Sequence, residues 1–126
     1  MKVLDASVLI RFLNKETGWE NILEILEGKI AVSSLNIAEF YTWWVRKGGK
    51  VREAEEIVSD MEIEIIDFDK TLAKQTAEIY PKTKQFGLSM GDRACLCTAN
   101  QLKSKVFTCD RIWKEAQLDG FEVEVV

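Results

Sequence analysis

Four acidic residues occupy positions in the sequence from which they could bind a metal ion. Asp5 interrupts an apolar run near the start of the chain and Asp110 directly follows another, while Glu39 and Asp92 lie near the starts of segments with helical periodicity. A carboxylate that is buried without a partner costs several kcal/mol or takes up a proton. A chain that keeps such an acid therefore needs a cation close to it.

The chemistry open to these acids is metal-assisted hydrolysis. Carboxylates brought close together repel one another unless a divalent ion neutralises them, and oxygen ligands without His or Cys favour Mg²⁺, with Mn²⁺ as a substitute. Such ions activate water and stabilise the charge that builds on a phosphate during in-line displacement, so phosphodiester hydrolysis fits. The hydroxyls of Ser7 and Thr108 could hold the carboxylates or the water, although buried structural hydroxyls are equally common.

Composition excludes several other kinds of site. The sequence contains no histidine, which rules out Ser/His and Cys/His pairs, histidine acid–base pairs and nearly all catalytic zinc sites. A net charge of -4 argues against a protein that coats nucleic acid by bulk attraction, but it leaves room for a local basic patch.

Each acid also has an ordinary structural explanation. Glu39 points away from the apolar stripe of its predicted helix, as a solvated surface residue would. The spacing from Ser89 to Asp92 fits a helix-capping signal, and Asp110 could equally be the N-cap of a short helix. Asp69 is expected to cap a helix, and we do not include it in the site. For the other four acids, only their combination favours a functional role.

Short β-rich runs alternate with helical patterns along the chain, which predicts a parallel sheet flanked by helices. In such sheets, ligands gather outside the carboxyl ends of the strands, where Asp5 and Asp110 fall. The predicted strands are 2–4, 30–32, 63–66, 106–108 and 122–125, the last of them an edge strand.

The helical segments are read from apolar spacing and from capping residues. A buried, central helix is expected from Ser89 to about Lys103, because nearly all of its sides are apolar or small. The other predicted helices are one around 19–26 that stops at Gly28, one from Ser34 to Gly48-Gly49, one over 51–61, one capped by Asp69 and kinked or ended by Pro81, and a short one over 110–117.

Length and composition describe one ordinary domain. At 126 residues the chain can bury a single hydrophobic core, and we expect one domain over residues 1–126, with 47% hydrophobic and 30% charged residues. No apolar stretch approaches the roughly 20 residues that a membrane helix needs, and the first residues do not read as a signal peptide, so we expect a cytoplasmic protein. The three cysteines follow no pairing pattern and are expected to be free thiols.

Four segments of the chain resemble the motifs of the PIN-domain nucleases and, within them, of the VapC-type toxins of prokaryotic toxin–antitoxin pairs. The third of these segments is the most specific, and together they cover nearly the whole chain in the family's order. They are VLDAS at 3–7, SSLNIAE at 33–39, LSMGDRACL at 88–96 and FTCDRIW at 107–113. All four acidic positions of the pattern are filled, at Asp5, Glu39, Asp92 and Asp110.

This resemblance implies a three-layer α/β/α sandwich around a central, mainly parallel sheet of about five strands. It implies that Asp5 and Asp92 are the principal Mg²⁺ ligands, and that Glu39 and Asp110 complete the acidic cluster. It also implies an RNA substrate, single-stranded or structured, a cognate antitoxin protein and homodimerisation.

Residues that could contact RNA or an antitoxin lie near the acids. Arg46 and Lys47 belong to a basic patch that could track a phosphate backbone, although a solvated helix end is the simpler explanation. Trp43 shares the face of Glu39 and could stack on a base, dock an antitoxin segment or pack under a loop. Arg93 directly follows a site acid and could hold phosphate or pin a carboxylate.

Three hypotheses follow from these residues. The leading one is an Mg²⁺-dependent endoribonuclease that acts as a toxin. The second is a non-catalytic PIN-like module that binds RNA or protein. A phosphatase with an Asp nucleophile is a weaker third, because such enzymes need an acid two residues beyond the first and Ser7 stands there.

Overall fold

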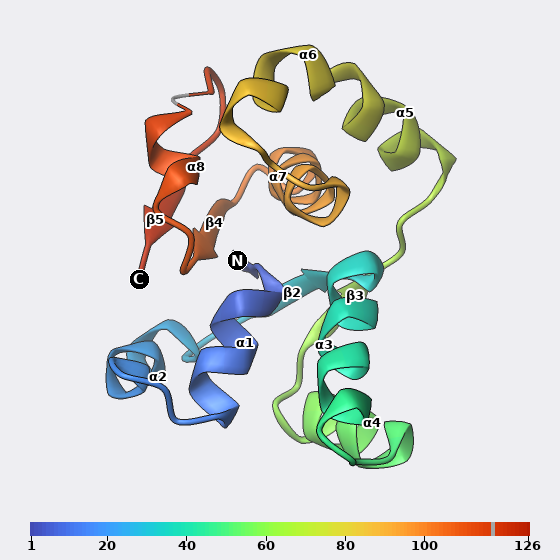
Figure 1. Cartoon of the computed structure of the whole chain (residues 1–126), viewed down its shortest axis with the longest axis vertical. Helices are drawn as coiled ribbons and strands as arrows, with labels where there is room; N and C mark the ends of the chain where they lie inside the picture. The colour runs from blue at the N-terminus through green and yellow to red at the C-terminus, as the bar shows by residue number, and fades with distance from the viewer. Residues whose placement is uncertain (117) are drawn as a thin grey trace.

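The protein folds around a sheet whose strands all run parallel, in the order β3-β2-β1-β4-β5 (Figure 1). A computed structural model describes residues 1–116 and 118–126. The strands are β1 (Lys2–Leu4), β2 (Ile30–Ser33), β3 (Glu64–Ile66), β4 (Lys105–Thr108) and β5 (Val123–Val125). The predicted parallel sheet is confirmed, the strand bounds agree within one residue, and β5 lies at an edge as expected.

Helices cover both faces of the sheet. The helical elements are α1 (Ala6–Leu13), η1 (Trp19–Asn21), α2 (Ile22–Ile25), α3 (Ser34–Arg46), α4 (Val51–Asp60), α5 (Lys70–Glu78), α6 (Tyr80–Thr83), η2 (Lys84–Phe86), α7 (Met90–Gln101) and α8 (Ile112–Glu115). In Figure 1, α1 to α4 lie on one side of the strands and α5 to α8 on the other. The three-layer α/β/α arrangement is therefore confirmed.

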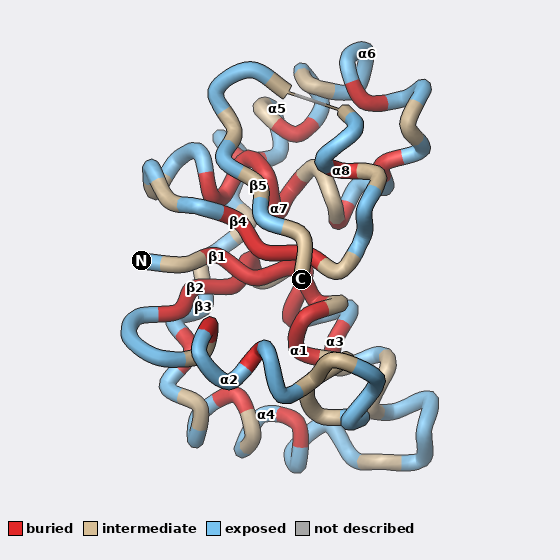
Figure 2. Tube along the Cα trace, turned by 90° about the vertical axis from the view of Figure 1, so that its left-hand side faces the viewer, coloured by how far each residue is buried: buried red, intermediate tan, exposed pale blue. Residues whose placement is uncertain are grey.

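Each face of the sheet has its own apolar core, because successive strand residues point to opposite sides. Leu4 and Val32 contribute to the core under α1 to α4, whereas Val3, Ala31 and Val106 contribute to the core under α7 and α8. Strand β2 is buried throughout, and β1 and β4 are buried after their first residues, Lys2 and Lys105, as expected for a parallel sheet covered on both faces (Figure 2).

Helix α1 was missed by the sequence-based assignment. Its residues continue the apolar run of β1 with almost no polar spacing, so the helical period is hard to separate from a buried strand. Five side chains on the apolar faces that the sequence predicts for the helices are in fact exposed: Leu23, Val45, Ala73, Tyr80 and Met90.

Several helix ends depend on single side chains. Ser33, and not Ser34, caps α3 by accepting a hydrogen bond from the Leu35 N–H, while the Ser34 hydroxyl accepts one from the Phe68 N–H. Asp69 caps α5 as predicted, by accepting from the Leu72 N–H. The expected break near Pro81 is present, since α5 ends at Glu78 and the proline lies at the start of α6.

The last helix is shorter than predicted. The pattern indicated 110–117, whereas α8 extends only from Ile112 to Glu115, and Gln117 lies outside the described residues. Within the described part of the chain, no helix is both long and apolar enough to cross a membrane.

Candidate active site

Asp5 is the buried centre of the candidate site. It follows the carboxyl end of β1, its backbone N–H donates to the Phe107 carbonyl of the neighbouring strand at 2.9 Å, and it is 6% exposed. Desolvation raises the pKa of its carboxyl group above the ordinary value. Hydrogen bonds from Ser7 and Thr108 oppose that rise, and the negative charge of Glu39 adds to it.

Two hydroxyl groups hold the Asp5 carboxylate. The Ser7 hydroxyl donates to Asp5 Oδ2 at 2.6 Å, and the Thr108 hydroxyl donates to the same oxygen at 3.1 Å. Each hydroxyl oxygen also accepts a bond from the loop that follows β4, because the Cys109 N–H donates to Ser7 and the Asp110 N–H donates to Thr108. Both hydroxyls therefore orient Asp5 and join the ends of β1 and β4.

Asp92 lies in the first turn of α7 and caps that helix. Its Oδ2 accepts a bond from the Ser89 N–H at 2.8 Å, and the Ser89 hydroxyl accepts one from the Asp92 N–H at 3.1 Å. The side chain is half-buried, and burial raises the pKa of its carboxyl group. The nearby charges of Asp5 and Asp110 raise this pKa further, so the cap does not account for the whole environment of Asp92.

Glu39 is exposed on α3, as its helical position predicted, but it is held in place. The side-chain amide of Asn36 donates to Glu39 Oε1 at 2.7 Å and also to the Gly91 carbonyl of α7 at 3.0 Å. Asn36 itself is fully buried. The sequence-based set of site residues did not include Asn36, although its spacing of three residues from Glu39 on a helix would place the two side chains together.

Asp110 lies on the surface directly after β4. Its Oδ1 accepts a bond from the Ile112 N–H at 3.1 Å, at the start of α8, although the N-cap position of that helix is held by Arg111. Its charge still acts on Asp92, whose pKa it helps to raise.

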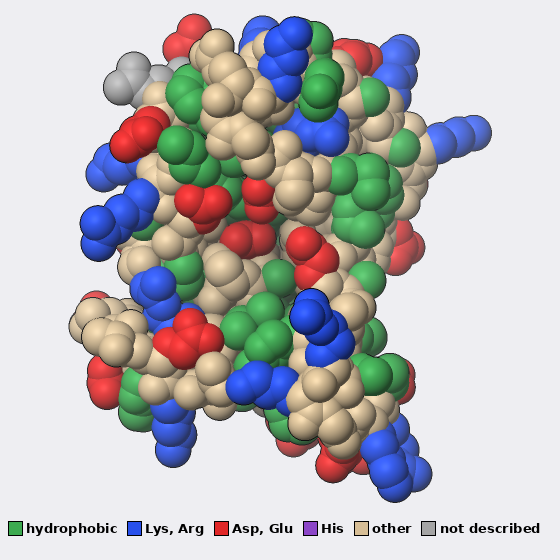
Figure 3. Space-filling view, viewed as in Figure 1, with side chains coloured by type: hydrophobic (Ala, Val, Ile, Leu, Met, Phe, Trp, Pro, Cys, Tyr) green, Lys and Arg blue, Asp and Glu red, His purple; other side chains and the backbone are tan. Residues whose placement is uncertain are grey.

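The four acids converge on one end of the sheet. Burial raises the pKa of the Cys95 thiol on α7, and the negative charges of Asp5, Asp92 and Glu39 raise it further. Figure 3 shows acidic side chains gathered around a hollow between the helices of the two faces. Asp5 and Glu39 come from the α1–α4 side of the sheet, and Asp92 and Asp110 from the α7–α8 side.

No protein cation neutralises this cluster in the described residues. Within residues 1–116 and 118–126, the one ion pair joins Lys105 to Glu124, at 3.5 Å on the surface. Over the same residues, no three acidic or cysteine side chains are already close enough together to hold a metal ion. The donors nevertheless fit Mg²⁺, because this ion is commonly bound by one or two carboxylates and keeps several waters.

The basic and aromatic residues that could contact RNA or an antitoxin lie in two places, one beside Glu39 on α3 and one between α7, α5 and α6. Trp43 stacks on Phe40 with ring centroids 6.1 Å apart, and the Lys47 ammonium lies 5.2 Å from the Trp43 ring. A groove beside the acids is lined by Ile10, Leu35, Ala38, Glu39, Thr42, Trp43 and Arg46. Arg93 instead donates to the Thr76 carbonyl at 2.7 Å and lies 5.1 Å from the Tyr80 ring, so its guanidinium group ties α7 to α5 and α6.

The cysteines are free thiols, as predicted. Cys95 and Cys97 are buried on α7, and Cys109 is half-buried in the loop after β4. The Cys109 thiol donates weakly to the Ser7 carbonyl at 3.6 Å, which places this loop against the start of α1.

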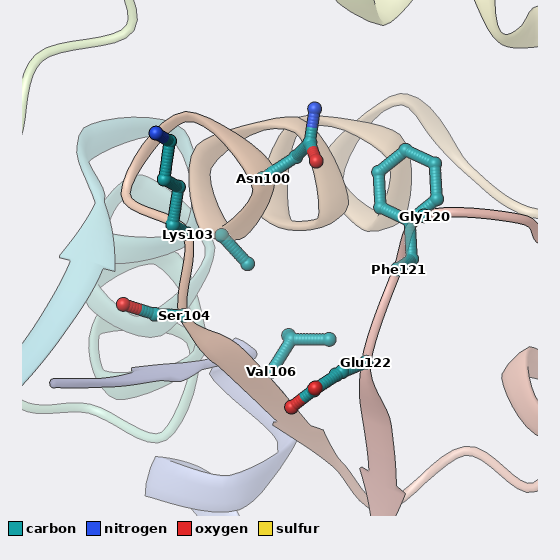
Figure 4. A pocket seen from close by; sticks show the side chains of 8 residues that line it. Asn100, Lys103, Ser104, Val106, Gly120, Phe121 and Glu122 are labelled. Carbon is teal, nitrogen blue, oxygen red and sulfur yellow. The ribbon is translucent and has the colours of Figure 1, made fainter.

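A separate cavity of about 240 Å³ lies at the opposite end of the sheet (Figure 4). Lys103 and Ser104 precede β4, and Phe121 and Glu122 precede β5, so these lining residues lie at the amino ends of the strands. The acids lie at the carboxyl ends, and the cavity is therefore not part of their site.

A model of the PIN domain matches residues 2–118 of the sequence. The fold is an α/β sandwich with acids at the carboxyl edge of a parallel sheet, and the chain belongs to the PIN-domain family, a family of nucleases. Within the family, its structural neighbours are VapC and FitB toxins of toxin–antitoxin systems. No curated protein sequence matches the chain significantly.

Three solved structures illustrate the likeness. The VapC20 toxin of Mycobacterium tuberculosis, described as cleaving the sarcin–ricin loop, has a TM-score of 0.78 at 13% identity, over 97% of this chain and 99% of that one. A toxin–antitoxin complex from Klebsiella pneumoniae has a TM-score of 0.75 at 16% identity, over 99% and 97%. VapBC2 of Rickettsia felis, bound to a promoter DNA fragment, has a TM-score of 0.71 at 21% identity, over 98% and 97%.

Proposed function

We propose that this protein is a Mg²⁺-dependent endoribonuclease and the toxin of a toxin–antitoxin pair. The observation that carries the proposal is the environment of Asp5. This carboxylate is 6% exposed, is held by two hydroxyl groups and is surrounded by further acids, with no Lys or Arg paired to them in the described residues. Such an arrangement is stable only when a cation or a proton joins it.

Asp5 and Asp92 are the proposed principal ligands, and Glu39 and Asp110 complete the site. A bound Mg²⁺ would supply an activated water and stabilisation of the charge that develops on phosphate. The protein's own contribution is to hold the acids. Ser7 and Thr108 hold Oδ2 of Asp5, so Oδ1 would be left to bind the ion, and the capping bonds fix Asp92. Mn²⁺ should substitute, since it also prefers oxygen ligands.

RNA as the substrate and an antitoxin as the partner are supported by the neighbours. VapC20 is described as a toxin that cleaves the sarcin–ricin loop, and several neighbours were solved as toxin–antitoxin complexes. The groove that leads from Glu39 past Trp43 to Arg46 offers an apolar and basic surface beside the acids for either partner. We also propose a homodimer, which the resemblance of the sequence to the VapC-type toxins implies.

A non-catalytic PIN-like binding module is the second candidate. The observation that favours it is the lack, among the described residues, of three acidic or cysteine side chains already gathered at ligand distance. In that case, the acids would not bind Mn²⁺ and the fold would serve only to dock RNA or protein.

The test is cleavage of a mixed RNA pool by the purified protein with Mg²⁺ or Mn²⁺, and then with EDTA. Asp5→Asn should abolish metal-dependent cleavage. Asp67→Asn is the matched control, because Asp67 also follows a strand of the same sheet but is exposed and outside the acidic cluster. Equal cleavage by Asp5→Asn and the parent protein would refute the nuclease assignment. Absence of cleavage together with undetectable Mn²⁺ binding in calorimetry would support the binding module.

A further inference from the structure

We infer that Asn36 and Gly91 position Glu39 in the acidic site, and that Gly91 is glycine because the Glu39 carboxylate lies against its Cα. This inference rests on the proposed metal-dependent function of the four acids. It concerns two residues that carry no charge and that no ligand set includes.

Asn36 links Glu39 to the opposite helical layer. Its amide group donates to Glu39 Oε1 at 2.7 Å and to the Gly91 carbonyl at 3.0 Å, so the same nitrogen fixes the carboxylate of α3 relative to the backbone of α7. Helices α3 and α7 come from different faces of the sheet, and residues 36 and 91 are 55 positions apart. The rotamer of Glu39 is therefore set by the contact between two layers.

Burying the side-chain amide of Asn36 lowers the stability of the fold compared with burying an apolar group. The residue is fully buried, on the side of α3 that also carries the buried residues Ile37 and Phe40, and its Oδ1 finds no hydrogen-bond partner among the described residues. A buried acceptor without a partner is destabilising, and an apolar side chain of similar size would avoid that cost. An apolar residue could not donate the two hydrogen bonds to Glu39 and Gly91, so these bonds are the reason for an amide at this position.

Gly91 gives Glu39 the space that it occupies. A Cβ added to Gly91 would lie 2.6 Å from Glu39 Oε1 and 2.7 Å from Oε2, closer than real Cβ contacts. Gly91 is buried in the first turn of α7, directly before Asp92. Any larger residue would push the Glu39 carboxylate away from Asn36 and from the acids. The atoms that would clash are the far end of a flexible side chain, so the fold itself can accommodate the change.

This geometry makes Gly91→Ala a sharp test. Ala favours a helix more than Gly does, so the variant should melt at the same temperature as the parent or higher. Partners that orient metal ligands typically contribute about 10- to 100-fold in metal affinity or activity. We expect Gly91→Ala to weaken Mn²⁺ binding in calorimetry by a factor in that range, and to slow metal-dependent RNA cleavage to a similar degree.

The control is a double-mutant cycle with Glu39→Gln. If Gly91 acts through Glu39, adding Gly91→Ala to Glu39→Gln should cause no further loss of Mn²⁺ affinity, because interacting residues are not additive. Full additivity of the two losses would overturn the inference. Asn36→Leu is a second test, since it removes the donor and the unpaired oxygen while keeping the branched shape and the number of heavy atoms, and it should lower Mn²⁺ affinity in the same non-additive way.

The failure of the inference can be told apart from the failure of the proposed function. If Glu39→Gln weakens Mn²⁺ binding but Gly91→Ala and Asn36→Leu do not, the acids form the site and the positioning role is wrong. If the parent protein and Glu39→Gln both fail to bind Mn²⁺, the proposed function is wrong, and the positioning role is overturned with it.

Discussion

Replacing Asp5 by Asn should stabilise the metal-free protein and remove its stabilisation by metal. The substitution keeps the shape of the side chain and leaves an oxygen that can accept the bonds from Ser7 and Thr108. It removes the buried negative charge, which desolvation and Glu39 both make unfavourable. The parent protein accepts that charge because a bound cation is expected to offset it.

The direction and size of the effect follow from proton linkage. Burial raises the folded-state pKa of Asp5 above its ordinary value of 3.8, so between the two pKa values the folded protein holds a proton that the unfolded chain has lost. The free energy of unfolding of the metal-free protein therefore falls as pH rises through this interval and stays lower at neutral pH. Each unit of difference in pKa corresponds to about 1.4 kcal/mol, and Asp5→Asn should recover that energy.

The assay is thermal unfolding at pH 7 in EDTA and in increasing Mn²⁺. A ligand that binds only the folded state stabilises it by about 2.7 kcal/mol at 100 times its dissociation constant, and 1 kcal/mol moves the melting temperature of a domain of this size by roughly 2 to 8 °C. The parent should gain several degrees with Mn²⁺. Asp5→Asn should melt higher than the parent in EDTA and should gain almost nothing from Mn²⁺. Asp92→Asn should also lose most of the metal response.

Two results would refute this reasoning. A variant that melts several degrees below the parent in EDTA would mean that the Asp5 charge stabilises the metal-free fold. A Mn²⁺ response equal to that of the parent would mean that Asp5 does not bind the ion. Asp67→Asn should change neither property, because Asp67 is exposed and no cluster of acids surrounds it.

Two further predictions concern single residues. Thr108→Val removes one of the two hydroxyl donors to Asp5 and the acceptor for the Asp110 N–H, so it should cost about 1–3 kcal/mol in urea unfolding at pH 7 and should raise the pKa of Asp5 further. The loss should be smaller at pH values where Asp5 is protonated, and an equal loss at every pH would contradict the proposed charge-assisted bond. Lys103 adopts a φ of 51°, which costs a residue with a Cβ about 1 kcal/mol, so Lys103→Gly should raise the urea midpoint. Lys105→Gly, in the regular backbone of β4, should lower it instead.

The strands could be predicted from sequence, and the acids could be singled out as candidates, because both signals are local. Short apolar runs bounded by turn residues gave strand bounds that agree within one residue, and Asp5 stood out because it interrupts one of those runs. Helix α1 escaped detection for the same reason, since its apolar residues directly continue the run of β1. Local patterns therefore predict elements well where polar residues separate them.

The contacts within the site could not be predicted in this way. The spacing along α3 could have paired Asn36 with Glu39, but the contacts of both residues with Gly91 arise because α3 and α7 approach each other from opposite faces, and no spacing along the chain encodes that approach. Arg93 shows the opposite case. Its position beside Asp92 suggested a role at the acids, whereas its guanidinium group contacts Thr76 and Tyr80 on the next helices. Neighbours in sequence were a poor guide to neighbours in the folded site.

Two of the acids lie on opposite faces of the sheet, and each face packs its own apolar core. Glu39 is carried by α3 on one face of the sheet and Asp92 by α7 on the other, so the distance between these two acids depends on how the two helical layers are aligned across the sheet. A close-packed interior transmits small displacements. A shift of one helical layer would therefore change the distance between these acids before any strand separates from the sheet. We therefore expect a core substitution far from the acids to weaken the proposed metal binding in a protein that is still fully folded.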